Sequence, residues 1–145
     1  MKRGYRLFTV LFAGAVLWSN HVMADGALAV GVPANVAKDG FAYGYSNNKP
    51  SAGAASKTAL DSCRSPSPVK SAPGRALCAV IGTYKNQCVA VAEDPAAGTP
   101  GVGWAIANDL RAAEAQALTK CEATAGPGRR AACRVDHSGC DGTAK

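Results

Sequence analysis

Six cysteines are the most reactive side chains of this sequence, and they fall into two groups of three. Cysteine side chains pair as disulfides, bind metals or act as nucleophiles. Six of them allow fifteen pairings, so the choice among pairings depends on the elements that carry them. In chain order they are Cys63, Cys78, Cys88, Cys121, Cys133 and Cys140.

A zinc site is the alternative use of the last two cysteines, because Cys133, His137 and Cys140 lie within eight residues. Structural zinc takes four ligands, and His137 is the only histidine after residue 24. Cysteines of exported proteins are usually oxidised. We therefore expect disulfides here, with no metal and no cofactor.

Asp136, His137 and Ser138 have the three side-chain types of a hydrolase triad. Neighbouring residues of a strand point to opposite faces, so these three cannot converge on one another. The sequence also lacks a nucleophile elbow, a phosphate-binding loop and an HExxH motif. We assign no catalytic residue.

A pair of carboxylates for glycoside hydrolysis is conceivable. The candidates sit at expected loop or helix-surface positions, where a solvated role is the simpler interpretation. They are Glu93, Asp94, Glu114 and Glu122.

Aromatic residues are the remaining candidates for ligand contact. Phe41, Tyr43 and Tyr45 alternate with Ala42 and Gly44, as in a strand with one aromatic face and one nearly bare face. The aromatic face is either a stacking platform for a carbohydrate or peptide or a packing face, and the bare face allows a helix to approach closely. The candidate binding residues are Tyr43, Tyr45, Tyr84 and Trp104.

The first 24 residues have the order of a signal peptide. Lys2, Arg3 and Arg6 precede an apolar run over residues 7–18, and Val22-Met23-Ala24 matches a cleavage site. The run is shorter than the ~20 residues of a spanning helix, although an uncleaved anchor is the alternative. We expect cleavage after Ala24, a secreted or periplasmic protein, and no stable membrane insertion afterwards.

Charge argues against nucleic acid as a partner. Without residues 1–24 the chain has thirteen basic and ten acidic residues, a net charge of +3. The basic residues are scattered, with Arg129-Arg130 the only adjacent pair after residue 24, whereas nucleic-acid surfaces need clustered cations. We expect a protein or cell-envelope ligand instead.

Two segments of similar order make up residues 25–145, which we expect to form one domain. Shifting the first segment by 61 residues places Tyr43 on Trp104, and a shift of 58 places Cys63 on Cys121. Each segment predicts two strands, an alanine-rich helix and a third strand. The first helix begins at Ser51, a good cap, and is followed by a surface loop over residues 65–74 and a strand over residues 76–83. We interpret residues 26–87 and 88–140 as two copies.

A set of short motifs occurs in a fixed order along residues 43–140. They are Tyr43-Gly44-Tyr45-Ser46, Ala54-Ala55 to Cys63, Cys78, Lys85-Asn86-Gln87-Cys88, Gly103-Trp104-Ala105, Ala112-Ala113 to Cys121, and Cys133-Arg134-Val135 to Cys140. In these motifs the chain resembles a family of small secreted bacterial domains, the domain of unknown function 4189. The resemblance covers nearly all of residues 25–145, and the loop over residues 65–74 is longer than the family pattern. It implies an exported, disulfide-bonded domain without agreed catalytic residues.

The duplication narrows the disulfide pairings, because equivalent cysteines should make equivalent bonds. Cys63–Cys78 and Cys121–Cys133 would each join the end of a helix to the following strand. Cys88–Cys140 would then join the two copies. Each closed loop of ~15 residues stabilises the fold by about 3 kcal/mol in the chain-entropy description.

These inferences predict an α+β fold of two β-β-α-β units, with both helices on one side of a largely antiparallel sheet. The expected function is a non-enzymatic binding module. A small secreted hydrolase acting on cell-envelope material is the alternative, and a structural envelope protein is a third possibility. A deep pocket with perturbed carboxylates would favour the enzyme, and an exposed aromatic patch would favour binding.

Overall fold

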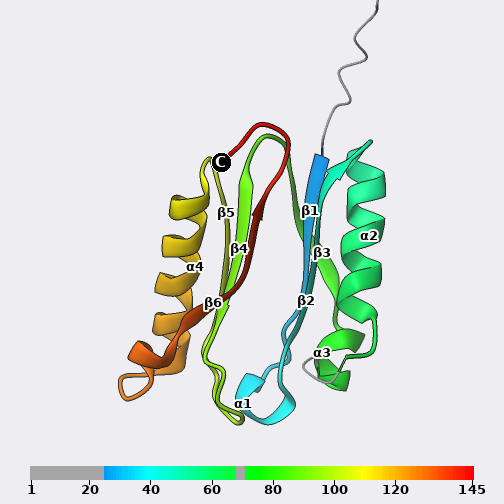
Figure 1. The fold of residues 1–145 in the computed structure, drawn as a ribbon. Coiled ribbons are helices and arrows are strands. Elements are labelled where there is room, and N and C mark those ends of the chain that lie inside the picture. Colours follow the sequence, from blue (N-terminus) through cyan, green and yellow to red (C-terminus); the bar gives the residue numbers. More distant parts are fainter. Residues whose placement is uncertain (1–24, 68–70) are drawn as a thin grey trace, which may run out of the picture.

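The computed structural model describes residues 25–67 and 71–145. The predicted signal peptide lies outside the described residues. The described residues form two three-stranded antiparallel sheets, one from each half of the chain (Figure 1).

The first sheet has the order β2-β1-β3 and packs against helix α2. A short helix precedes β2 and another precedes β3. The elements are β1 (Asp25–Gly31), α1 (Val36–Asp39), β2 (Ala42–Lys49), α2 (Ala52–Arg64), α3 (Ala72–Ala76) and β3 (Ala79–Tyr84).

The second sheet has the order β5-β4-β6 and packs against helix α4. As in the first sheet, the first strand in sequence is central. The elements are β4 (Cys88–Glu93), β5 (Val102–Ala107), α4 (Leu110–Ala125), the 3₁₀ turn η1 (Arg130–Ala132) and β6 (Arg134–Cys140).

Successive residues of the central strands β1 and β4 point to opposite faces of their sheets, and this gives the molecule four layers. Leu28 and Val30 of β1 pack with Val89 and Val91 of β4 between the sheets. The intervening alanines face outward, where one cluster packs under α2 and another under α4. The order of layers is therefore helix, sheet, sheet, helix (Figure 1).

The α+β class, the antiparallel strands and the disulfide cross-links are confirmed. The arrangement differs from the expected single sheet with both helices on one side, because the strands form two sheets and each helix covers the outer face of its own sheet. Strands with apolar residues on both faces require cover on both sides, and the second sheet supplies it.

The predicted start of α2 and the predicted bare face of β2 are both confirmed. At the start of the helix, Ser51 caps α2 by accepting a hydrogen bond from the Ala54 N–H at 3.2 Å. A Cβ at Gly44 would lie only 2.3 Å from the Cys63 nitrogen and 2.4 Å from the Ala59 oxygen. The helix backbone therefore approaches the strand to a distance that only glycine allows.

The region before β3 differs from the prediction. Residues 72–76, which straddle the expected loop and strand, form α3, and the strand begins at Ala79. Ser71 caps this helix by accepting from the Gly74 N–H at 2.9 Å, and Pro73 lies in its first turn. A capped first turn tolerates proline because its N–H groups have no partner within the helix.

The three disulfides have the predicted pairs, Cys63–Cys78, Cys121–Cys133 and Cys88–Cys140. The predicted role of the last bond was wrong, because Cys88 and Cys140 lie opposite each other on β4 and β6 of one sheet. The two sheets are joined instead by their shared core and by Asp141, whose carboxylate is fully buried. It accepts from the N–H groups of Asn48 at 2.7 Å and Asn86 at 3.3 Å.

Candidate functional site

A groove of about 500 Å³ lies between α1 with the start of β2 and the loop that connects β4 to β5. One wall is formed by residues 36–41 with Ser71, and the other by residues 93–99 with Gly101 and Val102. Both connections lie at the same end of the molecule (Figure 1). The volume is within the range of roughly 300–1,000 Å³ that is usual for small-ligand sites.

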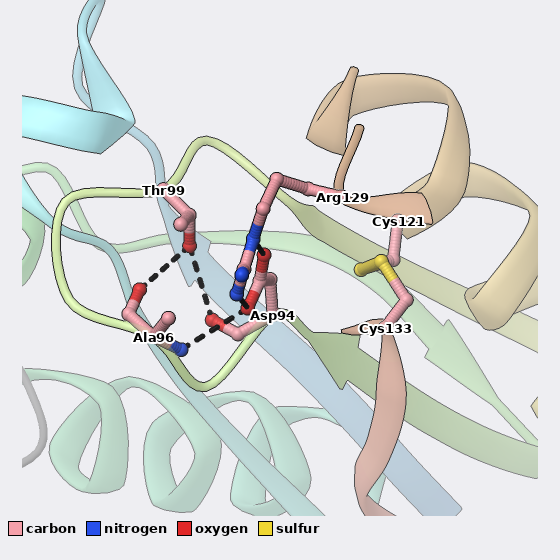
Figure 2. A network of polar contacts seen from close by, with 6 residues as sticks. All are labelled: Asp94, Ala96, Thr99, Cys121, Arg129 and Cys133. Atoms are coloured by element: carbon pink, nitrogen blue, oxygen red, sulfur yellow. Dashed lines mark hydrogen bonds and ion pairs between the residues drawn. A yellow bond between two sulfur atoms is a disulfide. The ribbon is translucent and has the colours of Figure 1, made fainter. Parts of the chain in front are cut away.

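The β4–β5 wall is held in one conformation by Asp94, whose side chain is 0% exposed. The carboxylate accepts two hydrogen bonds from Arg129, at 2.7 Å from Nε and 2.6 Å from the terminal nitrogen. It also accepts from the Ala96 N–H at 3.1 Å, while the Thr99 hydroxyl donates to the Ala96 carbonyl at 2.7 Å (Figure 2). The loop is therefore organised before any ligand arrives.

Arg129 is placed by the end of α4. It follows Gly126, which ends the helix with φ 81°, and it lies inside the loop that Cys121–Cys133 closes (Figure 2). Its two hydrogen bonds hold the pKa of Asp94 below the ordinary range, and Asp94 in turn raises the pKa of Arg129. Both groups remain charged at neutral pH.

The opposite wall is a single turn of helix, α1, whose residues are Val36, Ala37, Lys38 and Asp39. Asn35 caps α1 by accepting from the Lys38 N–H at 3.1 Å. Gly40 ends the turn with φ 67°, and a Cβ there would lie 2.7 Å from that of Ser71. The groove is lined by the nearly buried Phe41 and Val102, each 8% exposed.

Glu93 is the groove carboxylate with a raised pKa. The cause is first its burial, then the nearby negative charge of Asp136, while Arg134 acts in the opposite direction. The neighbouring Asp94 has its pKa lowered by Arg129. The pKa values of these two adjacent carboxylates are therefore shifted in opposite directions, and Glu93 binds a proton more readily than Asp94 does.

The prediction that these carboxylates occupy solvated positions was wrong for Asp94, which is fully buried. Glu114 accepts a hydrogen bond from the Ser138 hydroxyl at 2.6 Å, and Glu122 is exposed. The sequence signal for Asp94 was its place before Pro95, at the start of a turn-rich loop. Nothing in the sequence indicated Arg129 as its partner, because the two residues are 35 positions apart.

Two of the predicted binding residues lie together where β2 faces β6. The Tyr43 hydroxyl donates to Asp136, and the Tyr45 ring stacks on His137 with centroids 4.1 Å apart. Burial raises the pKa of both tyrosines, with a contribution from Asp136 at Tyr43. Burial also lowers the pKa of His137. Both tyrosines are half-buried.

Trp104 is separated from that pair, because β5 is the far edge strand of its sheet and faces β3, where the Ile106 side chain approaches Gly82. It is half-buried and borders a second hollow of about 310 Å³ with Lys120 and Thr124. Tyr43 and Trp104, which are equivalent in the two copies, therefore do not form one shared aromatic patch.

Tyr84 is a core residue, only 4% exposed, and is not placed to contact a partner. Its ring passes so close to Gly26 that a Cβ there would lie 2.1 Å away. Its hydroxyl then reaches across β1 and donates to the Asn47 side chain at 2.6 Å. Burial raises the pKa of its hydroxyl.

The three residues of β6 that have the side-chain types of a hydrolase triad contact three different partners. Asp136 accepts from Tyr43, His137 stacks on Tyr45, and Ser138 donates to Glu114 on α4. Cys133 and Cys140 are each bonded to a different cysteine, so they are not metal ligands.

A comparison with protein families identifies the chain. Residues 26–140 match the family described as domain of unknown function (DUF4189), which is most of the sequence. The chain belongs to this family, and the resemblance noted from its motifs is confirmed. No curated protein and no solved structure matched the chain.

Proposed function

We propose that this member of the DUF4189 family is a binding module that works outside the cytoplasm and holds a protein or cell-envelope ligand. The observation that carries the proposal is the groove of about 500 Å³ between the two hairpin connections. Its lining combines apolar side chains, Phe41 and Val102 among them, with the charged residues Lys38, Asp39 and Glu93, and the pKa of Glu93 is raised.

The rigidity of the groove supports binding. The Asp94–Arg129 contacts fix one wall, and the capped turn of α1 fixes the other. A site that is ordered in advance loses less conformational entropy when a ligand binds. Glu93 suits a ligand with a hydrogen-bond donor or a positive charge, because either would stabilise its ionised form.

Export is supported by the three disulfides, since these bonds persist in oxidising compartments. None of the helices in residues 25–67 and 71–145 is long and apolar enough to span a membrane. The basic and apolar order of residues 1–24 adds a signal peptide to the proposal.

A small hydrolase is the second candidate, and the raised pKa of Glu93 favours it. A carboxylic acid of this kind is suited to donate a proton, and the negative charge of Asp136 contributes to its raised pKa. The dispersal of Asp136, His137 and Ser138 argues against a serine hydrolase.

The test begins with a pull-down from envelope extract, followed by affinity measurements on the captured partner. Ala97 is exposed on the groove wall, so Ala97→Trp should fill the groove and weaken binding at least ~10-fold, or about 1.4 kcal/mol. Ala115→Trp, on the exposed face of α4, is the matched control. Unchanged affinity in Ala97→Trp would exclude the groove.

Two further variants separate the remaining surfaces. Tyr45→Ala and Trp104→Ala should weaken binding by about 1–3 kcal/mol only if these rings are anchors. A ring that anchors the partner should leave the melting temperature unchanged when it is removed, whereas removal of a core ring should lower it. Turnover of the captured partner that disappears in Glu93→Gln would establish the hydrolase instead.

A further inference from the structure

The Cys121–Cys133 disulfide is connected to the groove through one side chain. It closes the 12-residue loop that carries Arg129, and Arg129 donates two hydrogen bonds to Asp94 in the β4–β5 wall (Figure 2). Among the described residues, every hydrogen bond between this loop and that wall comes from Arg129. The position of one guanidinium group therefore links the disulfide to the conformation of the wall.

The loop has few other restraints among the described residues. Residues 127–131 are exposed, and the loop contains Gly126, which has φ 81°, and Gly128. The backbone hydrogen bonds of its turn are local, from the Arg129 N–H to the Gly126 carbonyl at 3.1 Å and from the Ala132 N–H to the Arg129 carbonyl at 2.9 Å. A segment of this kind has many more conformations when its ends are not joined. The disulfide therefore reduces the entropy that is lost when Arg129 binds Asp94.

Asp94 requires that arginine, because its side chain is 0% exposed. A buried carboxylate that loses its cationic partner is strongly destabilised, and it recovers free energy by reaching water. The same carboxylate accepts from the Ala96 N–H at 3.1 Å, so its movement also removes a hydrogen bond that shapes the loop. Loss of the Arg129 contact should therefore open the β4–β5 connection, while the ladders that β4 makes with β5 and β6 remain.

The two ends of this disulfide differ in their exposure. Cys121 is fully buried on α4, whereas Cys133 is partly exposed just before β6. A thiolate must reach the sulfur that it attacks, so the attack falls on Cys133. By contrast, Cys63 and Cys78 are both buried, at 0% and 3% exposure. A reductant should therefore open Cys121–Cys133 before it opens Cys63–Cys78.

We propose that Cys121–Cys133 is a redox switch of the groove wall, opened by a dithiol reductant such as a protein Cys-x-x-Cys pair. A thiolate of the reductant attacks the Cys133 sulfur, the S–S bond breaks, and Cys121 leaves as a thiolate that takes up a proton. The second thiol of the reductant then loses its proton and attacks the mixed disulfide. Cys133 is released and takes up that proton, and the reductant becomes a disulfide. Two electrons pass to the protein, and Arg129 leaves Asp94. The effect on ligand binding rests on the proposed function, whereas the effect on the wall does not.

Titration of the purified protein with dithiothreitol tests the switch, followed by alkylation and peptide mapping. Cys121 and Cys133 should be labelled at a reductant concentration at which Cys63 and Cys78 remain bonded. At that concentration the Ala96 amide should exchange hydrogen at least ~10-fold faster, while amides in the middle of β4 keep their protection. Labelling that appears only when all the cysteines react together, or an unchanged Ala96 rate once Cys121–Cys133 is open, overturns the proposal.

Arg129→Gln tests whether the disulfide acts through that side chain. In this variant the Ala96 amide should exchange quickly in the oxidised protein and show no further increase on reduction, because the contact is already lost. Arg130→Gln, in the same loop, is the matched control and should keep the difference between the oxidised and reduced protein. If reduction of Arg129→Gln still accelerates exchange ~10-fold, the disulfide does not act through Arg129 and the proposal fails.

Affinity for the captured partner separates the switch from the proposed function. Reduction of Cys121–Cys133 should weaken binding at least ~10-fold, because the groove loses one ordered wall. Faster exchange at Ala96 with unchanged affinity would support the switch and exclude the groove as the binding site. An unchanged exchange rate would overturn the switch, whatever the affinity.

Discussion

Two neighbouring carboxylates, Glu93 and Asp94, respond to their surroundings in opposite ways. Glu93 is half-buried near Asp136, and its pKa is raised. Asp94 is held by Arg129, and its pKa is lowered. One residue therefore opposes folding at neutral pH while the other supports it. A residue that destabilises the fold and lines a groove is a functional candidate.

Replacing Glu93 with glutamine should raise stability at neutral pH. Above the ordinary pKa of about 4.5 the unfolded chain loses its proton more readily than the folded chain, so ionisation of Glu93 disfavours folding. Urea unfolding should show Glu93→Gln more stable than wild type at pH 7 and equal to it at about pH 4. Glu122→Gln, at an exposed position, controls for the change in net charge.

The effect of Asp94 should have the opposite sign. Its lowered pKa means that its contribution is fully present above about pH 4 and is lost as the pH falls through the folded-state value. Arg129→Gln should lower the melting temperature at pH 7. It should also reduce the fall in melting temperature that occurs as the pH is lowered below about 4. Thermal unfolding between about pH 2 and pH 7 measures this, with Arg130→Gln as control. Parallel profiles for wild type and Arg129→Gln would contradict the assignment.

At the scale of elements, the helix-to-sheet contact depends on glycine at two places. Gly44 touches Cys63 and Ala59 of α2, and Gly103 makes the corresponding contacts with Ala117 and Cys121 of α4. In both cases a Cβ would lie 2.3–2.4 Å from helix backbone. Close approach of this kind replaces the large side chains that the sequence lacks.

Adding a methyl group at Gly44 should therefore push α2 away from its sheet. Gly44→Ala is expected to lower the free energy of unfolding by about 1–3 kcal/mol, as overpacked cores do. Gly53→Ala is the matched control, because its Cβ would meet only the Ser51 hydroxyl at 4.0 Å in the first turn of α2. It should stabilise the protein by roughly 0.5–1 kcal/mol. Chemical denaturation of both variants checks the difference in sign.

The two hairpins share one register, which supports the proposed duplication. Val30 pairs with Tyr43 and Val91 pairs with Trp104, and both pairs are related by a shift of 61 residues. The helices instead align by a shift of 58, since Cys63 corresponds to Cys121. Gly44 and Gly103 differ by 59 and not by 61, so α4 contacts the second strand of its hairpin two residues closer to the hairpin turn than α2 does.

For the whole molecule, both the disulfides and the core between the two sheets stabilise the four-layer fold. Cys63–Cys78 and Cys121–Cys133 close loops of 15 and 12 residues, and Cys88–Cys140 closes one of 52. The chain-entropy description makes the longest loop the most stabilising.

Replacing both members of a pair by serine should lower the free energy of unfolding by about 4 kcal/mol for Cys88–Cys140 and about 3 kcal/mol for Cys121–Cys133. The second change should also loosen the groove wall, because Arg129 lies within that loop. Denaturation gives the first quantity, and hydrogen exchange at Ala96 gives the second. Faster exchange at Ala96 in the Cys88–Cys140 variant alone would contradict this assignment.

The sequence by itself determined the local features of this protein. Alternation predicted the strands, Ser51 predicted the start of α2, and the bare Ala42–Gly44 face predicted close helix packing. The repeated cysteine order predicted all three disulfide pairs. These features depend on residues near one another or on their repetition, which a linear pattern records.

Only the tertiary structure decided how the two halves meet, because nothing in a strand pattern says which apolar face covers which. It made Tyr84 a core residue and kept Trp104 apart from Tyr43. It also joined Asp94 to Arg129, 35 positions further along the chain. Each of these outcomes depends on contacts between segments far apart in the chain, and their energies arise only after the sheets have packed face to face.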